Sequence, residues 1–171
     1  VAVPLSYNAG LRRVAVVDLL VVASGFVLRA IAGAVAVDVP MSTWFVLCVS
    51  FGALFVVAGK RFAELLARGD AAVEGRASLG RYSVGYLRSV VVVALTVTML
   101  TYCLWAFESY VAAGSVWFVL SIVPVVGVLL RYLLVLDSGG GAAPEEVFWR
   151  DRPIQVLGAV WVLVYALAVY S

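Results

Sequence analysis

The stretch SVVVVALTVTMLTYCLWAF, residues 89–107, contains no charged side chain over 19 residues. An α-helix rises about 1.5 Å per residue, so about 20 apolar residues cross the hydrocarbon core of a bilayer. Two more uncharged runs of 19 residues lie at 41–59 and 153–171. These runs are typical of transmembrane helices.

Composition supports the same fold class, because 65% of residues are hydrophobic, only 13% are charged, and the mean hydropathy is +1.11. Soluble domains carry about 25% charged residues. Two further apolar segments contain charge, with Asp18 and Arg29 in the first and Arg131 near the end of the second. We predict an all-α polytopic membrane helix bundle in a single transmembrane domain, 1–171. Its five spans are expected at about 14–37, 41–59, 87–107, 115–136 and 153–171, joined by loops that include 60–86 and 137–152.

The 12 basic residues lie near the start of the chain or around those two long loops, apart from Arg29. The opposite loops, DVPMST (38–43) and ESYVAAG (108–114), contain no lysine or arginine. By the positive-inside rule, the start of the chain and the long loops are cytoplasmic. Topology, together with attraction to anionic lipid, explains these cations as well as ligand binding does.

The spacing within AGKRFAELLARGDAAVEGRASLGRYSVGYLR, residues 58–88, favours a more specific role. Lys60 and Glu64 are four residues apart, which places them on one face of a helix that continues the second span. Helix is expected to resume near Ser78, so that Ser78, Tyr82 and Tyr86 form a stripe of hydroxyl groups. Lysine, arginine and tyrosine are hydrogen-bond donors, and together they suit an anionic ligand such as a phosphate. An interfacial aromatic belt explains the tyrosines well, but it explains the group of Lys60, Arg61 and Glu64 less well.

Arg29 is expected about 20–25 Å from the cytoplasmic end of its span, too deep to reach that surface. Gly25 and Gly33 lie one turn on either side of it, and Asp18 lies about 20° away around an ideal helix. We therefore expect Arg29 to face protein, within reach of Asp18 or of a polar group on a neighbouring helix. A structural polar network is favoured over a ligand path, although both remain open.

Other features carry less information about function. Cys48 and Cys103 are expected to be small packing residues, and the chain contains no histidine. Asp70 and Glu74 have the spacing of a Mg²⁺-binding pair, but the glycines beside them favour a solvated loop. Pro124 should kink the fourth span. The segment DSGGGAAPEEVFWRDRP, 137–153, predicts a turn, a short helix that begins at its first proline, and a cap for the last span.

Five motifs, in order, resemble one family: ASGFVLRAIAGAVA (23–36), AGKRFAEL (58–65), SLGRYSVGYLR (78–88), YCLWAFE (102–108) and EEVFWRDRPIQ (145–155). They are similar to the C-terminal part of the decaprenyl-phosphate phosphoribosyltransferase family, within the UbiA-type membrane prenyltransferase superfamily. The resemblance runs almost end to end. It implies that the five spans are the last five of a nine-helix fold whose central cavity faces the cytoplasm. Phe62 stands where the family more often has tyrosine.

The resemblance implies transfer of the phosphoribosyl group of phosphoribosyl pyrophosphate onto a decaprenyl (polyprenyl) phosphate in a bacterial plasma membrane. Pyrophosphate is released, and the product leads to cell-wall arabinan precursors. The family binds Mg²⁺ through an Asn-Asp-x-x-Asp-x-x-x-Asp motif in its N-terminal half. That motif is absent here, so these residues supply no metal ligand, and the 171-residue chain alone is expected to be inactive. Membrane lipid is the other expected partner, no nucleic acid is expected, and the oligomeric state is left open.

The same resemblance suggests roles for individual side chains, without assigning a catalytic residue. The candidates for contact with substrate phosphate are Lys60, Arg61, Tyr82, Tyr86, Arg88, Arg150 and Arg152. The orienting or structural polar residues are Asp18, Arg29, Glu64 and Asp151.

Two alternatives stay open. The first keeps the fold but transfers a prenyl group from a prenyl diphosphate to an aromatic or haem acceptor. Enzymes of that kind carry a second Asp-rich motif in the loop that is basic here, which favours a phosphoribosyl donor. The second is a non-enzymatic subunit that binds or transports polyprenyl phosphate.

Overall fold

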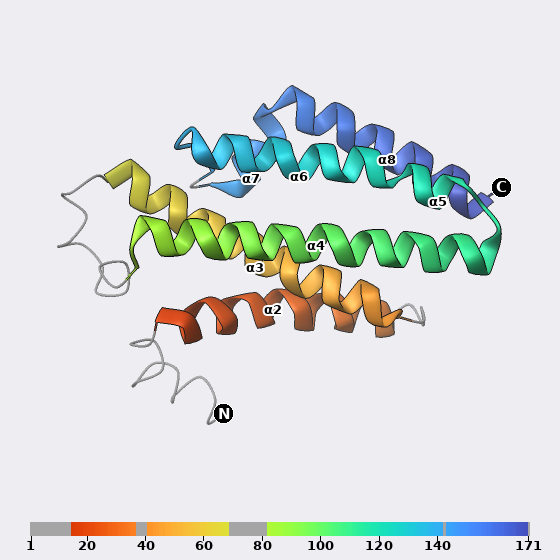
Figure 1. Cartoon of the computed structure of the whole chain (residues 1–171), viewed down its shortest axis with the longest axis horizontal. Helices are drawn as coiled ribbons and strands as arrows, with labels where there is room; N and C mark the ends of the chain where they lie inside the picture. Colours follow the sequence, from red (N-terminus) through yellow and green to blue (C-terminus); the bar gives the residue numbers. More distant parts are fainter. Residues whose placement is uncertain (1–14, 37–40, 69–81, 142, 171) are drawn as a thin grey trace.

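The computed structural model describes residues 15–36, 41–68, 82–141 and 143–170, and helices are the regular elements in these ranges (Figure 1). The elements are α2 (Ala15–Ala36), α3 (Thr43–Arg68), α4 (Val84–Ala113), α5 (Trp117–Leu120), α6 (Ile122–Asp137), α7 (Pro144–Arg150) and α8 (Arg152–Tyr170). The all-α prediction is confirmed.

Within the described ranges, five helical segments are long and apolar enough to cross a membrane, as the sequence predicts. They are Val16–Ala36, Thr43–Ala67, Val84–Ala113, Trp117–Asp137 and Arg152–Tyr170. The third of these ends at Gly114, whose φ of 73° lies in the left-handed region that glycine adopts readily. The chain is therefore a multi-pass membrane protein.

Neighbouring spans run in alternating directions and pack in sequence order (Figure 1). Helix α3 contacts α2 on one side and α4 on the other, while α6 contacts both α8 and the α3–α4 pair. The most deeply buried large side chains include Phe55, Leu87 and Leu136, one each from α3, α4 and α6. Gly59 allows a close approach here, because a Cβ atom at this position would lie 2.7 Å from Cδ1 of Leu136. The core thus lies directly beside Lys60.

The fourth span is interrupted at Ser121, which separates α5 from α6 just before Pro124. Proline has no amide hydrogen to donate to the preceding turn, so the predicted disturbance of this helix is explained. The Ser121 hydroxyl lies 2.8 Å from the Tyr102 hydroxyl, and Nε1 of Trp161 donates to that same oxygen at 2.7 Å. These bonds tie α4 and α8 to the interruption.

The carboxyl ends of α3 and α6 and the amino ends of α4 and α8 meet at one end of the bundle, on the left in Figure 1. We call this the basic end. The halves of these helices that lie toward it, together with α7, contain Lys60, Arg61, Arg88, Arg131, Arg150 and Arg152. Arg29, in the middle of α2, is the exception among the described cations with described side chains. The fold therefore gathers residues from distant parts of the sequence.

Candidate functional site

Arg61 forms an ion cluster with two carboxylates. Its Nη2 lies 3.3 Å from Oδ2 of Asp18 on α2, and its Nη1 lies 3.5 Å from Oε2 of Glu64, one turn further along α3. Asp18 is only 3% exposed, and a buried carboxylate requires such a partner to remain charged. Arg61 therefore joins α2 to α3. The i,i+4 spacing of Lys60 and Glu64 suggested that these two residues pair, but the ion pair of Glu64 is with Arg61.

Arg29 does not occupy the position that its spacing from Asp18 predicted. It is exposed in the described chain, whereas Asp18 turns toward α3 and pairs with Arg61. A Cβ atom added at Gly25 or Gly33 would meet nothing within 4 Å, so this face of α2 is open among the described residues. The prediction that Arg29 faces the bundle interior is thus not met within these ranges. Among the described residues, the ion-pair partner of Asp18 is Arg61 on the neighbouring helix α3.

Lys60 is exposed, and it forms no ion pair with another residue that the structure describes. It follows Gly59, the position at which α3 packs closely on Leu136 of α6. The backbone of Lys60 is therefore held by the core while its ammonium group is open to solvent. Such a cation is available to an incoming anion without first losing an ion-pair partner among the described residues.

The predicted hydroxyl stripe is wrong at its start. Helix α4 begins at Val84, and the Ser83 hydroxyl caps it by accepting from the amide of Tyr86 at 3.1 Å. Tyr82 therefore precedes the helix, and Ser78 lies outside the described residues. Tyr82 is 6% exposed and Tyr86 is 42% exposed, and their rings stack with centroids 6.1 Å apart. Serine is a preferred N-cap residue, so Ser83 was the signal in the sequence for the start of this helix. The four-residue spacing of the hydroxyl groups wrongly extended the helix past that cap.

Arg88, in α4, pairs with Asp137, the last residue of α6. Nη2 of Arg88 lies 3.5 Å from Oδ1 of Asp137, and the two side chains are 68% and 59% exposed. An exposed pair at this distance contributes little to stability and exchanges readily with solvent or another ion. The guanidinium remains accessible to an anion.

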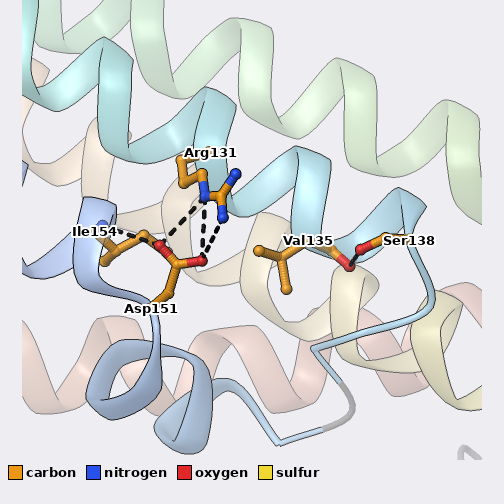
Figure 2. A network of polar contacts seen from close by, with 5 residues as sticks. All are labelled: Arg131, Val135, Ser138, Asp151 and Ile154. Carbon is orange, nitrogen blue, oxygen red and sulfur yellow. Dashed lines mark hydrogen bonds and ion pairs between the residues drawn. The ribbon is translucent and has the colours of Figure 1, made fainter.

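Arg131 and Asp151 form the shortest ion pair among the described residues of the basic end (Figure 2). Nε of Arg131 lies 3.1 Å from Oδ2 of Asp151, and Nη2 lies 2.9 Å from the same oxygen. Asp151 also accepts from the amide of Ile154 at 3.1 Å and so caps α8, as the sequence predicted for this segment. The hydrogen bond from Arg131 is the main reason that the pKa of Asp151 is lowered, with smaller help from the Ile154 amide.

The Arg131–Asp151 pair was not predicted, although both charges flank the loop between the last two spans. Charges that flank a short connection between antiparallel helices lie at the same end of both, and that proximity was the available signal. Arg131 and Asp151 form an ion pair with each other. They are therefore structural, and they position the loop that carries Arg150.

Arg150 and Arg152 remain outward-facing. Nη1 of Arg150 lies 3.6 Å from Oε2 of Glu146 in α7, and the Arg150 side chain is 83% exposed. Arg152, the first residue of α8, is also exposed. Helix α7 begins with Pro144 and has acidic residues in its first turn, as predicted. Both arginines are placed where an anion at the basic end can reach them.

The carboxylates do not form a metal site in the part of the chain that the structure describes. No group of three acidic, cysteine or histidine side chains there could hold a metal ion. Five acidic residues of the basic end are instead engaged with arginines: Asp18, Glu64, Asp137, Glu146 and Asp151. Asp70 and Glu74 lie outside the described residues. These described residues therefore do not fit a Mg²⁺ ion.

Comparison with known proteins shows which enzymes the chain is related to. It is 43% identical over 168 residues to the decaprenyl-phosphate phosphoribosyltransferase of Mycobacterium tuberculosis and 40% identical over 172 residues to that of Corynebacterium glutamicum. The Mycolicibacterium smegmatis enzyme of the same name is 39% identical over 178 residues. These matches cover 98–99% of the chain and 52–56% of the relatives, so the chain spans about half their length. No family model matches. Over almost its whole length, the chain is a relative of the decaprenyl-phosphate phosphoribosyltransferases.

Proposed function

We propose that the chain is part of a membrane transferase that moves the phosphoribosyl group of phosphoribosyl pyrophosphate onto decaprenyl phosphate. The identity to decaprenyl-phosphate phosphoribosyltransferases over 98% of the chain carries this proposal. The gathering of exposed cations at the basic end supports it, because both proposed substrates are anions with several oxygens. The product would serve cell-wall arabinan synthesis, and the fold would be the nine-helix UbiA-type fold.

The proposed reaction needs little acid–base chemistry. An oxygen of the lipid phosphate attacks C1 of the ribose, a new C–O bond forms, and the bond from C1 to pyrophosphate breaks with its electron pair. The nucleophile is already ionised at neutral pH, so no base must first remove a proton. The chain contains no histidine, the commonest general base, which agrees with such a step. The main task of the protein is then to position the substrates and neutralise their charge.

The contacts divide the candidate cations into two groups. Arg61 is held by Asp18 and Glu64, so its proposed role is to position the end of α3. Lys60 has no ion-pair partner among the described residues and would contact donor phosphate directly. Arg88, Arg150 and Arg152 are exposed, and the ion pairs of the first two are long enough to exchange.

A divalent ion, expected to be Mg²⁺, would neutralise the leaving pyrophosphate if it binds. Its ligands would have to lie outside the described residues, so no step above depends on it. We also propose that the basic end faces the cytoplasm of a bacterial cell, in accordance with the distribution of positive charge. The water-soluble phosphoribosyl donor would then reach the site from the aqueous side.

The test is an assay of full-length protein in membranes with radiolabelled phosphoribosyl pyrophosphate and decaprenyl phosphate. We expect label in the lipid fraction and release of pyrophosphate in equal amount. A parallel reaction supplies a prenyl diphosphate with an aromatic acceptor. Transfer in that reaction alone would assign the chain to prenyl transfer, and binding of decaprenyl phosphate without any transfer would favour a lipid-binding subunit.

A further inference from the structure

A groove lies between α4 and α6 at the basic end, with one polar end and a long apolar wall. It encloses about 300 Å³ and includes Arg88 and Asp137. Its apolar lining is Val91 and Val92 of α4, Leu130, Leu133 and Leu134 of α6, and the buried Phe62 of α3. The groove therefore has the chemistry of an amphiphile site, with charge at one end only.

Position along the helices separates the two parts. Asp137 ends α6, and Arg88 follows the first turn of α4, so the charges stand at the mouth. Leu130 lies two turns before Asp137, which places the apolar wall about 10 Å deeper in the span. Val92, Leu130 and Leu134 are 45%, 49% and 57% exposed, so the wall is open along the side of the described bundle. A hydrocarbon chain can enter such a groove laterally.

At the charged mouth, the carboxylate of Asp137 is a weakly held partner of Arg88 that a phosphate group can replace. The Arg88–Asp137 distance is 3.5 Å and both side chains are largely exposed, so their attraction is weak. Asp137 also lies at the carboxyl end of α6, where the helix dipole disfavours negative charge. A phosphate group can accept two parallel hydrogen bonds from one guanidinium. Arg88 can thus exchange Asp137 for a lipid phosphate.

We propose that this groove is the acceptor site, binding polyprenyl phosphate with its phosphate on Arg88 and its first isoprene units along the leucines of α6. The identity of the lipid rests on the proposed function, whereas the polarity of the groove does not. Asp137 is then a competing anion that is displaced when the lipid binds. This role gives Arg88 and Asp137 opposite effects, which a purely structural ion pair would not have.

The experiment measures binding of decaprenyl phosphate to full-length protein in nanodiscs, with decaprenol and phosphatidylglycerol as comparison lipids. We expect Arg88→Ala to weaken decaprenyl phosphate binding by about ten- to a hundredfold and to leave decaprenol unaffected. Asp137→Asn should strengthen decaprenyl phosphate binding. Equal weakening by both substitutions would identify a structural clamp and overturn the proposal, as would equal binding of phosphatidylglycerol by the unchanged protein.

A second arm tests the apolar wall. Leu134→Trp should fill the groove and weaken both decaprenyl phosphate and decaprenol. Leu163→Trp on α8 is the matched control, because Leu163 is 62% exposed and lies outside the groove. Similar effects of the two tryptophans would refute a specific tail site. Normal thermal unfolding of each variant shows that it has folded.

Binding and turnover separate this proposal from the function on which it rests. If the variants change lipid binding as expected but the protein transfers no phosphoribosyl group, the proposed function fails and the groove assignment stands. If transfer occurs and the Michaelis constant for decaprenyl phosphate is unchanged in Arg88→Ala and Leu134→Trp, the groove assignment alone is overturned.

Discussion

The guanidinium of Arg61 on α3 lies 3.3 Å from the buried carboxylate of Asp18 on α2. Because of this contact, Arg61 and the preceding Lys60 have different surroundings although they are neighbours on one helix. Arg61 faces inward and holds two helices together, whereas Lys60 faces outward at the same level. Adjacent cations in one motif therefore have separable roles, structural for Arg61 and ligand-binding for Lys60 in our proposal.

Arg61→Ala should destabilise the bundle, because it removes the guanidinium beside a buried carboxylate. The expected loss is about 1–3 kcal/mol in the free energy of unfolding, measured by thermal or denaturant unfolding in detergent. Lys60→Ala is the matched control, and its stability should stay close to that of the unchanged protein. Adding Asp18→Asn to Arg61→Ala should recover part of the loss. Equal stability of the two alanine variants would contradict the structural role.

Lys60→Ala should instead reduce activity while membrane insertion remains normal. Loss of a charge-assisted contact of about 1.5–3 kcal/mol corresponds to a ten- to hundredfold fall in kcat/KM for phosphoribosyl pyrophosphate. Lys60→Arg keeps the charge and should retain more activity. The measurement is steady-state transfer in membranes, with expression level as the check on folding. Unchanged kinetics in Lys60→Ala would mean that this lysine only sets topology.

Asp151 should show two separable contributions to stability. Asp151→Asn keeps a good cap for α8 but loses the ionic bond to Arg131, whereas Asp151→Ala loses both. The alanine variant should therefore unfold more easily, with the cap accounting for about 1 kcal/mol of the difference. Unfolding of both variants side by side measures this. If they are equally stable, the Ile154 contact does not contribute.

The same carboxylate predicts a dependence on pH. Its pKa is lower in the folded chain than the ordinary value of about 3.9, chiefly because of the Arg131 hydrogen bond. The stabilisation is therefore fully present above that ordinary value and is lost as pH falls through the lowered pKa. Melting temperatures of the unchanged protein and Asp151→Asn should converge as pH falls below about 4. A constant gap between them down to pH 3 would contradict this assignment.

Two buried tyrosines should respond in opposite ways to loss of the hydroxyl. Tyr102 bonds Ser121 and Trp161, so Tyr102→Phe should destabilise by about 1–2 kcal/mol. The Tyr132 hydroxyl is buried without a hydrogen-bond partner among the described residues, so Tyr132→Phe should be neutral or stabilising. Thermal unfolding compares the two. A large loss in Tyr132→Phe would reveal a partner for its hydroxyl.

Much of the fold could be predicted without a structure, because membrane insertion depends on the length and polarity of single segments. The uncharged run at 89–107, the break near Pro124 and the short helix at Pro144 are all local signals of this kind. The distribution of lysine and arginine likewise predicted that the described helix ends next to the two long loops meet at one end of the bundle. The relationship to decaprenyl-phosphate phosphoribosyltransferases also follows from sequence alone.

Pairing between side chains depended on tertiary structure, because it requires the rotation of each helix about its axis. Periodicity placed Arg29 on the same face as Asp18, yet Asp18 points toward Arg61 on α3. Spacing likewise linked Glu64 to Lys60, but the packing of α3 on α2 turns Glu64 toward Arg61. The groove between α4 and α6 joins Arg88 to Asp137 across 49 positions of sequence. The amino-acid sequence alone predicted the five apolar helices of the described ranges and the end at which their cations gather. Only packing decided which cations are neutralised by carboxylates and which remain open to a ligand, because that choice depends on a few ångströms between helices.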